Sequence, residues 1–127
     1  MNSKILKVFN KHLSEFIADL VTIFPEDNAL KTFQTYVEGL RKINPKSILV
    51  GWQYYITQKY KQEIYSGNID YFLKKDYQED LSDIPEDMGY YMEIIEKLRR
   101  PLSKLSTKNK EKAKKYLKNL TKLSELY

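Results

Sequence analysis

The acidic stretch between Asp76 and Asp83 has the residue types that could bind calcium or serve as acid and base. An EF-hand loop needs oxygen ligands at its first, third and fifth positions, glycine at the sixth and glutamate at the twelfth. Counted from Asp76, Gln78 is a poor third ligand, Leu81 replaces the glycine and Asp87 replaces the glutamate. The stretch therefore predicts a solvated acidic loop and no metal site, and its sequence singles out no pair of carboxylates for hydrolysis.

The rest of the chain has few residues suited to catalysis. His12 is its only histidine, and it has no cysteine, which excludes disulfides and thiolate metal sites. Its four glycines are too far apart in sequence for a phosphate-binding loop. We therefore predict that the protein is not an enzyme and has no cofactor, no metal and no small-molecule substrate. An enzyme with an unfamiliar carboxylate site is the remaining alternative.

The basic residues near the C-terminus give a stronger signal. Lysines recur every four residues from Lys110 to Lys122, and like charges at this spacing disfavour an isolated helix by roughly 0.2–0.5 kcal/mol per pair. Packing of the opposite face, the acidic part of this chain or an anionic partner must offset that repulsion. An acidic protein surface and nucleic acid phosphates are both suitable partners. The candidate contact residues are Arg99, Arg100, Lys110, Lys114, Lys115, Lys118 and Lys122, with Lys108 and Lys112 widening the patch.

Clustered aromatic residues supply further candidate contacts. Trp52, Tyr54 and Tyr55 lie within about one helical turn, so they cannot all face one core. We expect Trp52 to be buried and either Tyr54 or Tyr55 to be exposed. The pair Tyr90-Tyr91 poses the same problem, and Tyr90 is the expected surface member.

Apolar residues at steps of three and four predict helices and no strands. The expected faces are Ile5, Phe9, Leu13, Phe16, Leu20 and Ile23; Leu30, Phe33, Val37 and Leu40; Leu49, Trp52, Ile56 and Tyr60, with a break near Lys59 and a last turn through Ile64; Tyr91, Ile94, Leu98, Leu102 and Leu105; and Ala113, Leu117, Leu120, Leu123 or Ser124, and Tyr127. A short helix with buried aromatics is expected around Ile69, Tyr71, Phe72 and Leu73.

Prolines, glycines and capping residues predict where these helices begin and end. The expected boundaries are an end at Phe24-Pro25, a start at Asp27 or Asn28, a start at Asn44-Pro45 with Asn44 as the cap, an end at Gly67, a kink or end at Pro101, and a last start at Ser106 or Thr107. Short connections favour antiparallel neighbours. The sequence thus predicts an all-α, compact irregular bundle of five to six helices, forming a single domain over residues 1–127.

Charge is distributed in blocks along the 127 residues, whose net charge is +5. Residues 1–67 carry +3, the acidic segment 68–96 carries −7, and the basic C-terminal segment 97–127 carries +9. Such blocks can pair within one fold, between copies or with other partners. The chain shows neither a signal-peptide pattern nor an apolar run long enough to span a membrane. We therefore expect an intracellular protein that is not secreted.

Several short strings occur in order along the chain. They are Phe24-Pro25, Arg41 to Lys46, Trp52, Gly67 to Phe72, Lys75-Asp76-Tyr77, Leu98 to Leu102 and Tyr116 to Leu120. In this order the chain resembles a group of short helical proteins encoded by nucleocytoplasmic large DNA viruses (giant viruses). The resemblance implies a protein made in the host cytoplasm and carried in the virion, and it transfers no catalytic residue.

These observations favour a non-enzymatic structural or interaction protein, a minor capsid or core component of a virion that bridges larger proteins. Its expected partners are viral structural proteins or further copies of itself. The alternative is a nucleic-acid-binding accessory in viral genome packaging or late transcription, acting through the basic C-terminal helix.

Overall fold

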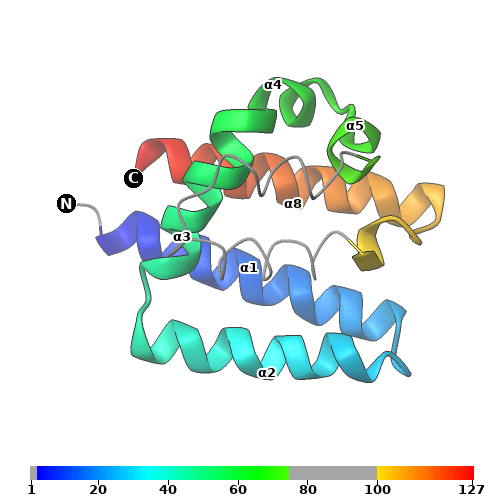
Figure 1. Cartoon of the computed structure of the whole chain (residues 1–127), viewed down its shortest axis with the longest axis horizontal. Helices are drawn as coiled ribbons and strands as arrows, with labels where there is room; N and C mark the ends of the chain where they lie inside the picture. The colour runs from blue at the N-terminus through cyan, green and yellow to red at the C-terminus, as the bar shows by residue number, and fades with distance from the viewer. Residues whose placement is uncertain (1–2, 75–99) are drawn as a thin grey trace.

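The computed structural model describes residues 3–74 and 100–127, with side chains described for 3–71 and 100–127. These residues form helices and no strand, which confirms the all-α prediction (Figure 1). The elements are α1 (Ser3–Ile23), α2 (Asn28–Ile43), α3 (Ser47–Trp52), the π-helical η1 (Gln53–Thr57), α4 (Gln58–Ser66), α5 (Ile69–Lys74) and α8 (Thr107–Leu126).

Helices α1 and α2 form an antiparallel hairpin, and α8 lies along α1 on the side away from α2 (Figure 1). The chain direction of α8 is opposite to that of α1. The continuous helical unit made of α3, η1 and α4 crosses these helices and contacts α8 through each of its three parts. Helix α8 is therefore held from two sides, by α1 and by the α3–α4 unit.

Trp52 lies at the centre of the core where these helices meet. Its side chain is 1% exposed, and its ring meets the Phe9 ring of α1 edge-on, with 5.8 Å between the ring centroids. Its indole Nε1 donates to Thr121 Oγ1 of α8 at 3.1 Å. The apolar faces predicted for α1, α2, the α3–α4 unit and α8 supply most of the remaining core. One aromatic side chain thus joins three elements far apart in the sequence.

Most predicted helix ends are confirmed. Helix α1 ends at Ile23, just before Phe24-Pro25. Asp27 caps α2, because its Oδ1 accepts a hydrogen bond from the Leu30 amide at 3.0 Å. Ser106 caps α8 in the same way. The sequence left Asp27 and Asn28, and also Ser106 and Thr107, as alternatives, and the structure selects the first of each pair.

The start predicted at Asn44-Pro45 was wrong. Asn44 follows the last residue of α2, with its amide donating to the Leu40 carbonyl at 2.7 Å, and α3 begins only at Ser47. The Asn44 carbonyl accepts from both the amide and the hydroxyl of Ser47, at 3.2 and 2.9 Å. A backbone carbonyl takes the role that the sequence assigned to the Asn44 side chain, so the helix starts later.

The third helix does not break near Lys59. Instead it contains a π-turn farther upstream, in which the Gln58 amide donates to the Gln53 carbonyl, and helical structure continues to Ser66. The short helix after Gly67 is confirmed as α5, but Tyr71 is 47% exposed and not buried. Tyr71 follows the buried Ile69 by two residues, which places it on the opposite side of the helix.

The predicted acidic loop and most of the predicted fifth helix lie outside the described residues, as do Arg99 and Tyr90. Leu102 and Leu105, the last two residues of the apolar face predicted from Tyr91 onward, are described and are buried as expected.

Gly67 and Gly39 allow the same substitution to be tested in opposite backbone settings. Gly67 ends α4 with φ of 85°, and the Asn68 amide donates to the Glu63 carbonyl at 2.8 Å, a Schellman arrangement. We expect Gly67→Ala to lower the free energy of unfolding by roughly 1 kcal/mol, because left-handed backbone disfavours a Cβ. Gly39→Ala, inside α2, should raise it by roughly 0.5–1 kcal/mol.

An added Cβ meets nothing within 4 Å at either glycine, so only the backbone conformation differs between the two substitutions. Urea unfolding followed by circular dichroism measures both. Equal effects of the same sign would contradict the left-handed cap.

Candidate interaction surface on helix α8

Helix α8 has one line of residues fixed in the core and another line in solvent. The buried line is Ala113, Leu117, Leu120, Thr121 and Ser124. The exposed lysines are Lys108, Lys112, Lys115 and Lys122, which we call the outer lysine line. Their spacing of four, three and seven residues keeps them on one side of the helix. The predicted C-terminal basic helix therefore presents its charge from a fixed position.

The lysines predicted to form a stripe at every fourth residue do not all lie on one exposed surface. Lys110, Lys114 and Lys118 are half-buried on the flank of α8, whereas Lys122 is exposed. Lys110 Nζ lies 3.5 Å from Asp70 Oδ1 of α5, and Lys114 Nζ lies 2.8 Å from Glu111 Oε1. The hydrogen bond from Lys114 and its charge hold the pKa of Glu111 below its usual value. Part of the repulsion expected from the sequence is thus offset inside the chain.

The outer lysine line makes no ion pair in the part of the chain that the structure describes, although the charge of Lys115 adds to that of Lys114 in lowering the pKa of Glu111. There, no carboxylate lies within ion-pair distance of the amines of Lys108, Lys112, Lys115 or Lys122. Among residues 3–71 and 100–127, no acidic group occupies these side chains.

Arg100, a predicted contact residue, is used in the fold. Its Nη2 lies 3.2 Å from Asp27 Oδ2 and 3.4 Å from Oδ1, so it clamps the turn between α1 and α2. The pKa of Asp27 is held low, first by the hydrogen bond from the Leu30 amide and then by Arg100. Although the guanidinium remains partly exposed, its charge already has a partner.

The exposed fractions of Tyr54 and Tyr55 decide which of the two can contact a partner. Tyr54 is 48% exposed and remains a candidate contact. Tyr55 is 2% exposed, so its selection as a contact residue was wrong. Tyr55 lies three residues after Trp52 and one before Ile56, which places it on the face that both of these residues bury.

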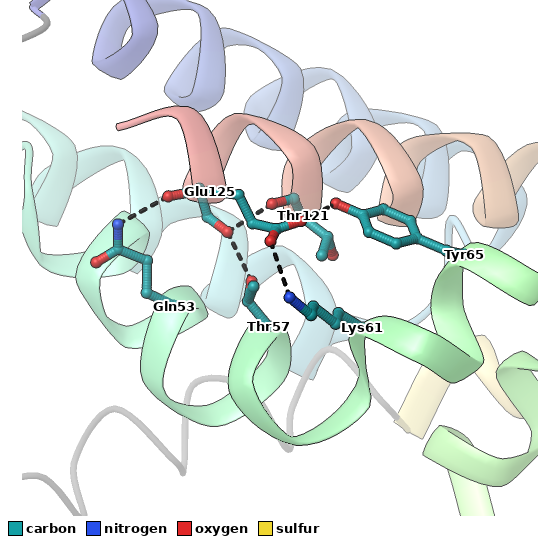
Figure 2. Close-up of polar contacts among 7 residues, drawn as sticks. Gln53, Thr57, Lys61, Tyr65, Thr121 and Glu125 are labelled. Atoms are coloured by element: carbon teal, nitrogen blue, oxygen red, sulfur yellow. Dashed lines mark hydrogen bonds and ion pairs between the residues drawn. The ribbon is translucent and has the colours of Figure 1, made fainter.

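A seam of polar side chains, which the sequence did not predict, joins the α3–α4 unit to the C-terminal half of α8. Figure 2 shows Gln53, Thr57, Lys61 and Tyr65 pointing from one side toward Thr121 and Glu125 on the other. Ser124 of α8 also belongs to the seam, because it bonds to Gln53 and Thr57. The four residues on the first side are four apart in sequence, so they form one row along the helix.

The buried end of the seam is fully hydrogen-bonded. Ser124 Oγ donates to the Thr121 carbonyl at 2.6 Å, and it lies 2.6 Å from Thr57 Oγ1. Because a serine hydroxyl has a single proton, Thr57 must be the donor in the second bond. Gln53 Nε2 donates to the Ser124 carbonyl at 2.8 Å. These bonds need one register of α8, so they fix its rotation and with it the direction of the outer lysine line.

The exposed end of the seam is a small charged cluster. Glu125 accepts from the Tyr65 hydroxyl, and its Oε2 lies 3.2 Å from Lys61 Nζ. Both contacts hold the pKa of Glu125 below its usual value. Desolvation and the Glu125 carboxylate together raise the pKa of Tyr65 to about 12. Exposed ion pairs contribute only about 0–1 kcal/mol, so this end supports the seam rather than dominates it.

The π-turn helps to keep this row in line. Four residues exceed one turn of an α-helix, which has 3.6 residues per turn, so side chains four apart drift around the axis. The wider turn from Gln53 to Gln58 takes up the extra residue. The available signal in the sequence was the presence of Thr57, Thr121 and Ser124 at positions that helical periodicity places beside the core.

A second contact fixes the middle of α8 against α1. The Tyr116 ring stacks on the Phe16 ring, with 4.8 Å between centroids and 13° between planes. The Tyr116 hydroxyl donates to Asp19 Oδ2 at 2.6 Å. This hydrogen bond, with desolvation, raises the pKa of Tyr116 to about 12.

Comparison with known proteins supplies no further guide, because no protein-family model, curated protein or solved structure matches the chain. Within residues 3–71 and 100–127, no three acidic or histidine side chains gather where they could hold a metal ion. None of the described helices has the length and apolar character needed to cross a membrane. The outer lysine line is therefore the strongest candidate site in the described residues.

The bond between Thr57 and Ser124 can be tested by a double-mutant cycle. We expect Ser124→Ala to lower the free energy of unfolding by about 1–3 kcal/mol, because it leaves the buried Thr57 hydroxyl without an acceptor. The double variant Thr57→Val/Ser124→Ala should cost less than the sum of the single changes, with a coupling of at least about 0.5 kcal/mol. Urea denaturation measures all three.

Thr35→Val is the matched control, because the exposed Thr35 hydroxyl bonds only to the Lys31 carbonyl of its own helix. Its effect should stay within about 0.5 kcal/mol. Strict additivity of the two seam substitutions would contradict the bond.

The raised pKa of Tyr116 predicts a change of stability in alkaline solution. The unfolded chain ionises this tyrosine near its ordinary value of 10, whereas the folded chain keeps the proton to about 12. The folded state thus binds more protons in this window, and stability falls as pH rises from 10 to 12. Tyr116→Phe removes this contribution, so the advantage of the unsubstituted protein over the variant should shrink across that range. Chemical denaturation at several pH values measures it, and a constant difference would exclude the effect.

Proposed function

We propose that this chain is a non-enzymatic interaction protein that binds an acidic protein partner through the outer lysine line of α8. The observation that carries the proposal is the set of exposed lysines without carboxylate partners in the described residues, on a helix whose opposite side is buried. Among the described residues, Lys110 and Lys114 of the same helix do meet acids, at Asp70 and Glu111, so the outer lysine line differs from its flank.

The fixed position of α8 supports this proposal. The line from Lys108 to Lys122 extends over about 21 Å at a rise of 1.5 Å per residue. The seam with the α3–α4 unit and the Tyr116 contact with α1 hold the helix before any partner arrives. Binding to such a surface does not require the helix backbone to become ordered, which lowers the entropy cost. Charge complementarity would also speed the encounter and make it sensitive to salt.

The biological setting that we propose is a virion, in which the protein is a minor capsid or core component that bridges larger proteins. The support is the resemblance, carried by the ordered short motifs, to a group of short helical proteins encoded by nucleocytoplasmic large DNA viruses. The exposed Tyr54 would supply a second, amphipathic contact on the α3–α4 unit. Quantitative mass spectrometry of purified particles tests this setting, with a fixed ratio to the major shell protein expected. Absence from the particles would exclude it.

Nucleic acid is the alternative partner, because an exposed lysine line also suits phosphates. It would place the protein in genome packaging or late transcription. Binding to duplex DNA would lose affinity steeply with salt, since each neutralised phosphate releases counterions.

A charge-matched pair of variants tests the surface. We expect the unsubstituted protein to bind poly-L-glutamate at 50 mM salt, and Lys108→Gln/Lys112→Gln/Lys115→Gln/Lys122→Gln to bind it at least about tenfold more weakly. That loss corresponds to about 1.4 kcal/mol. The control changes four other exposed lysines to Gln, at positions Lys11, Lys31, Lys42 and Lys46. Fluorescence anisotropy measures both, with a 25-base-pair DNA duplex as the competing probe.

The control variant has the same net charge as the test variant, so an equal loss in both would show only a general charge effect. Stronger binding to the duplex than to poly-L-glutamate would select the nucleic acid alternative. Binding to neither probe at low salt would exclude both functions.

A further inference from the structure

A pocket of about 140 Å³ lies between the C-terminal half of α1 and the N-terminal half of α8. The apolar half of its lining is Phe16, Leu20, Ile23, Leu105 and Ala113, and the polar half is Asp19, Thr22, Asn109, Lys112 and Tyr116. An apolar cavity of about 150 Å³ accommodates one benzene molecule. The pocket therefore has the size of one leucine or phenylalanine side chain.

The pocket is continuous with the outer lysine line. Lys112 belongs to both, and the exposed Lys108 and Lys115 lie one turn before and one turn after it. Asp19 also lines the pocket, but Tyr116 already donates a hydrogen bond to its carboxylate. A segment lying on this face of α8 would thus meet three ammonium groups beside one apolar hollow.

We propose that this pocket holds a single leucine- or phenylalanine-sized side chain of an acidic partner segment, whose carboxylates contact Lys108, Lys112 and Lys115. The inference rests on the proposed function and adds the partner's anchor residue. Charge complementarity selects acidic neighbours of the anchor, and the apolar lining selects the anchor. Interfaces commonly combine one buried apolar anchor with a charged rim in this way.

Protein is favoured over nucleic acid as the occupant because most of the surface that lines the pocket is hydrocarbon. A nucleobase would set much of its polar edge against Leu20, Leu105 and Ala113, although Thr22 and Asn109 also line the pocket and could meet part of it. A phenyl or isobutyl group has no polar edge to leave unpaired.

Two blocked heptapeptides test the proposal, one with a central phenylalanine between three glutamates on each side and one with alanine at the centre. We expect the protein to bind the phenylalanine peptide about tenfold more tightly. Ala113→Leu extends into the pocket from its buried wall without changing charge, so it should abolish this preference; because Ala113 is 2% exposed, circular dichroism first establishes that the variant folds. Ala18→Leu, on the exposed side of α1, is the control that should keep the preference. Isothermal titration calorimetry measures all combinations.

Methyl NMR locates the anchor even if Ala113→Leu fails to fold. The phenylalanine ring should shift the methyl signals of Ala113, Leu105 and Leu20 in the unsubstituted protein. Equal affinity for the two peptides, a preference that survives Ala113→Leu, or ring shifts elsewhere would overturn the pocket assignment while the proposed function stands. The same shifts on raising protein concentration alone would assign the pocket to a second copy and overturn it too. If neither peptide nor poly-L-glutamate binds, the proposed function itself fails.

Discussion

The indole of Trp52 imposes the constraint on which the rest of the structure depends. A large ring is costly to leave in water, but its N–H also needs an acceptor once it is buried. Phe9 of α1 covers the ring, and Thr121 of α8 accepts the hydrogen bond at 3.1 Å. Both partners must be present at once, so α1 and α8 have to meet at this position on the third helix. The pairing of α8 with α1 and its crossing by the α3–α4 unit satisfy this requirement.

The polar seam extends that constraint along α8. An apolar interface tolerates small slides and rotations, because one methyl contact can replace another. Thr57, Ser124 and Gln53 do not allow such movements, because each of their hydrogen bonds needs one specific acceptor atom within hydrogen-bond distance. Moving α8 by one residue would leave buried hydroxyls unpaired, at about 1–3 kcal/mol each. The direction of the outer lysine line is therefore set by bonds on the far side of the same helix.

The sequence predicted the helices more accurately than the surface they form. Apolar periodicity located α1, α2, α4 and α8 because each buries one continuous face, and Gly67 and Ser106 ended or began helices by purely local chemistry. Asn44 misled the prediction because a backbone carbonyl can replace a capping side chain. Arg100 and Lys110 are not free for a partner because they form ion pairs with Asp27 and Asp70, which are distant in sequence. No periodic pattern reports such partners, so a stripe of charge in sequence overestimates the charge that is free in space.

The spacing of the seam along the chain has a consequence for how the protein folds. Thr57 and Ser124 are 67 residues apart, Gln53 and Ser124 are 71 apart, and Trp52 and Thr121 are 69 apart. Bonds between such distant residues form only after a long loop has closed, whereas the α1–α2 hairpin needs only short-range contacts. We expect the hairpin to be populated first and α8 to dock late. In this order of events, the Trp52 indole N–H would gain its Thr121 acceptor only when α8 docks.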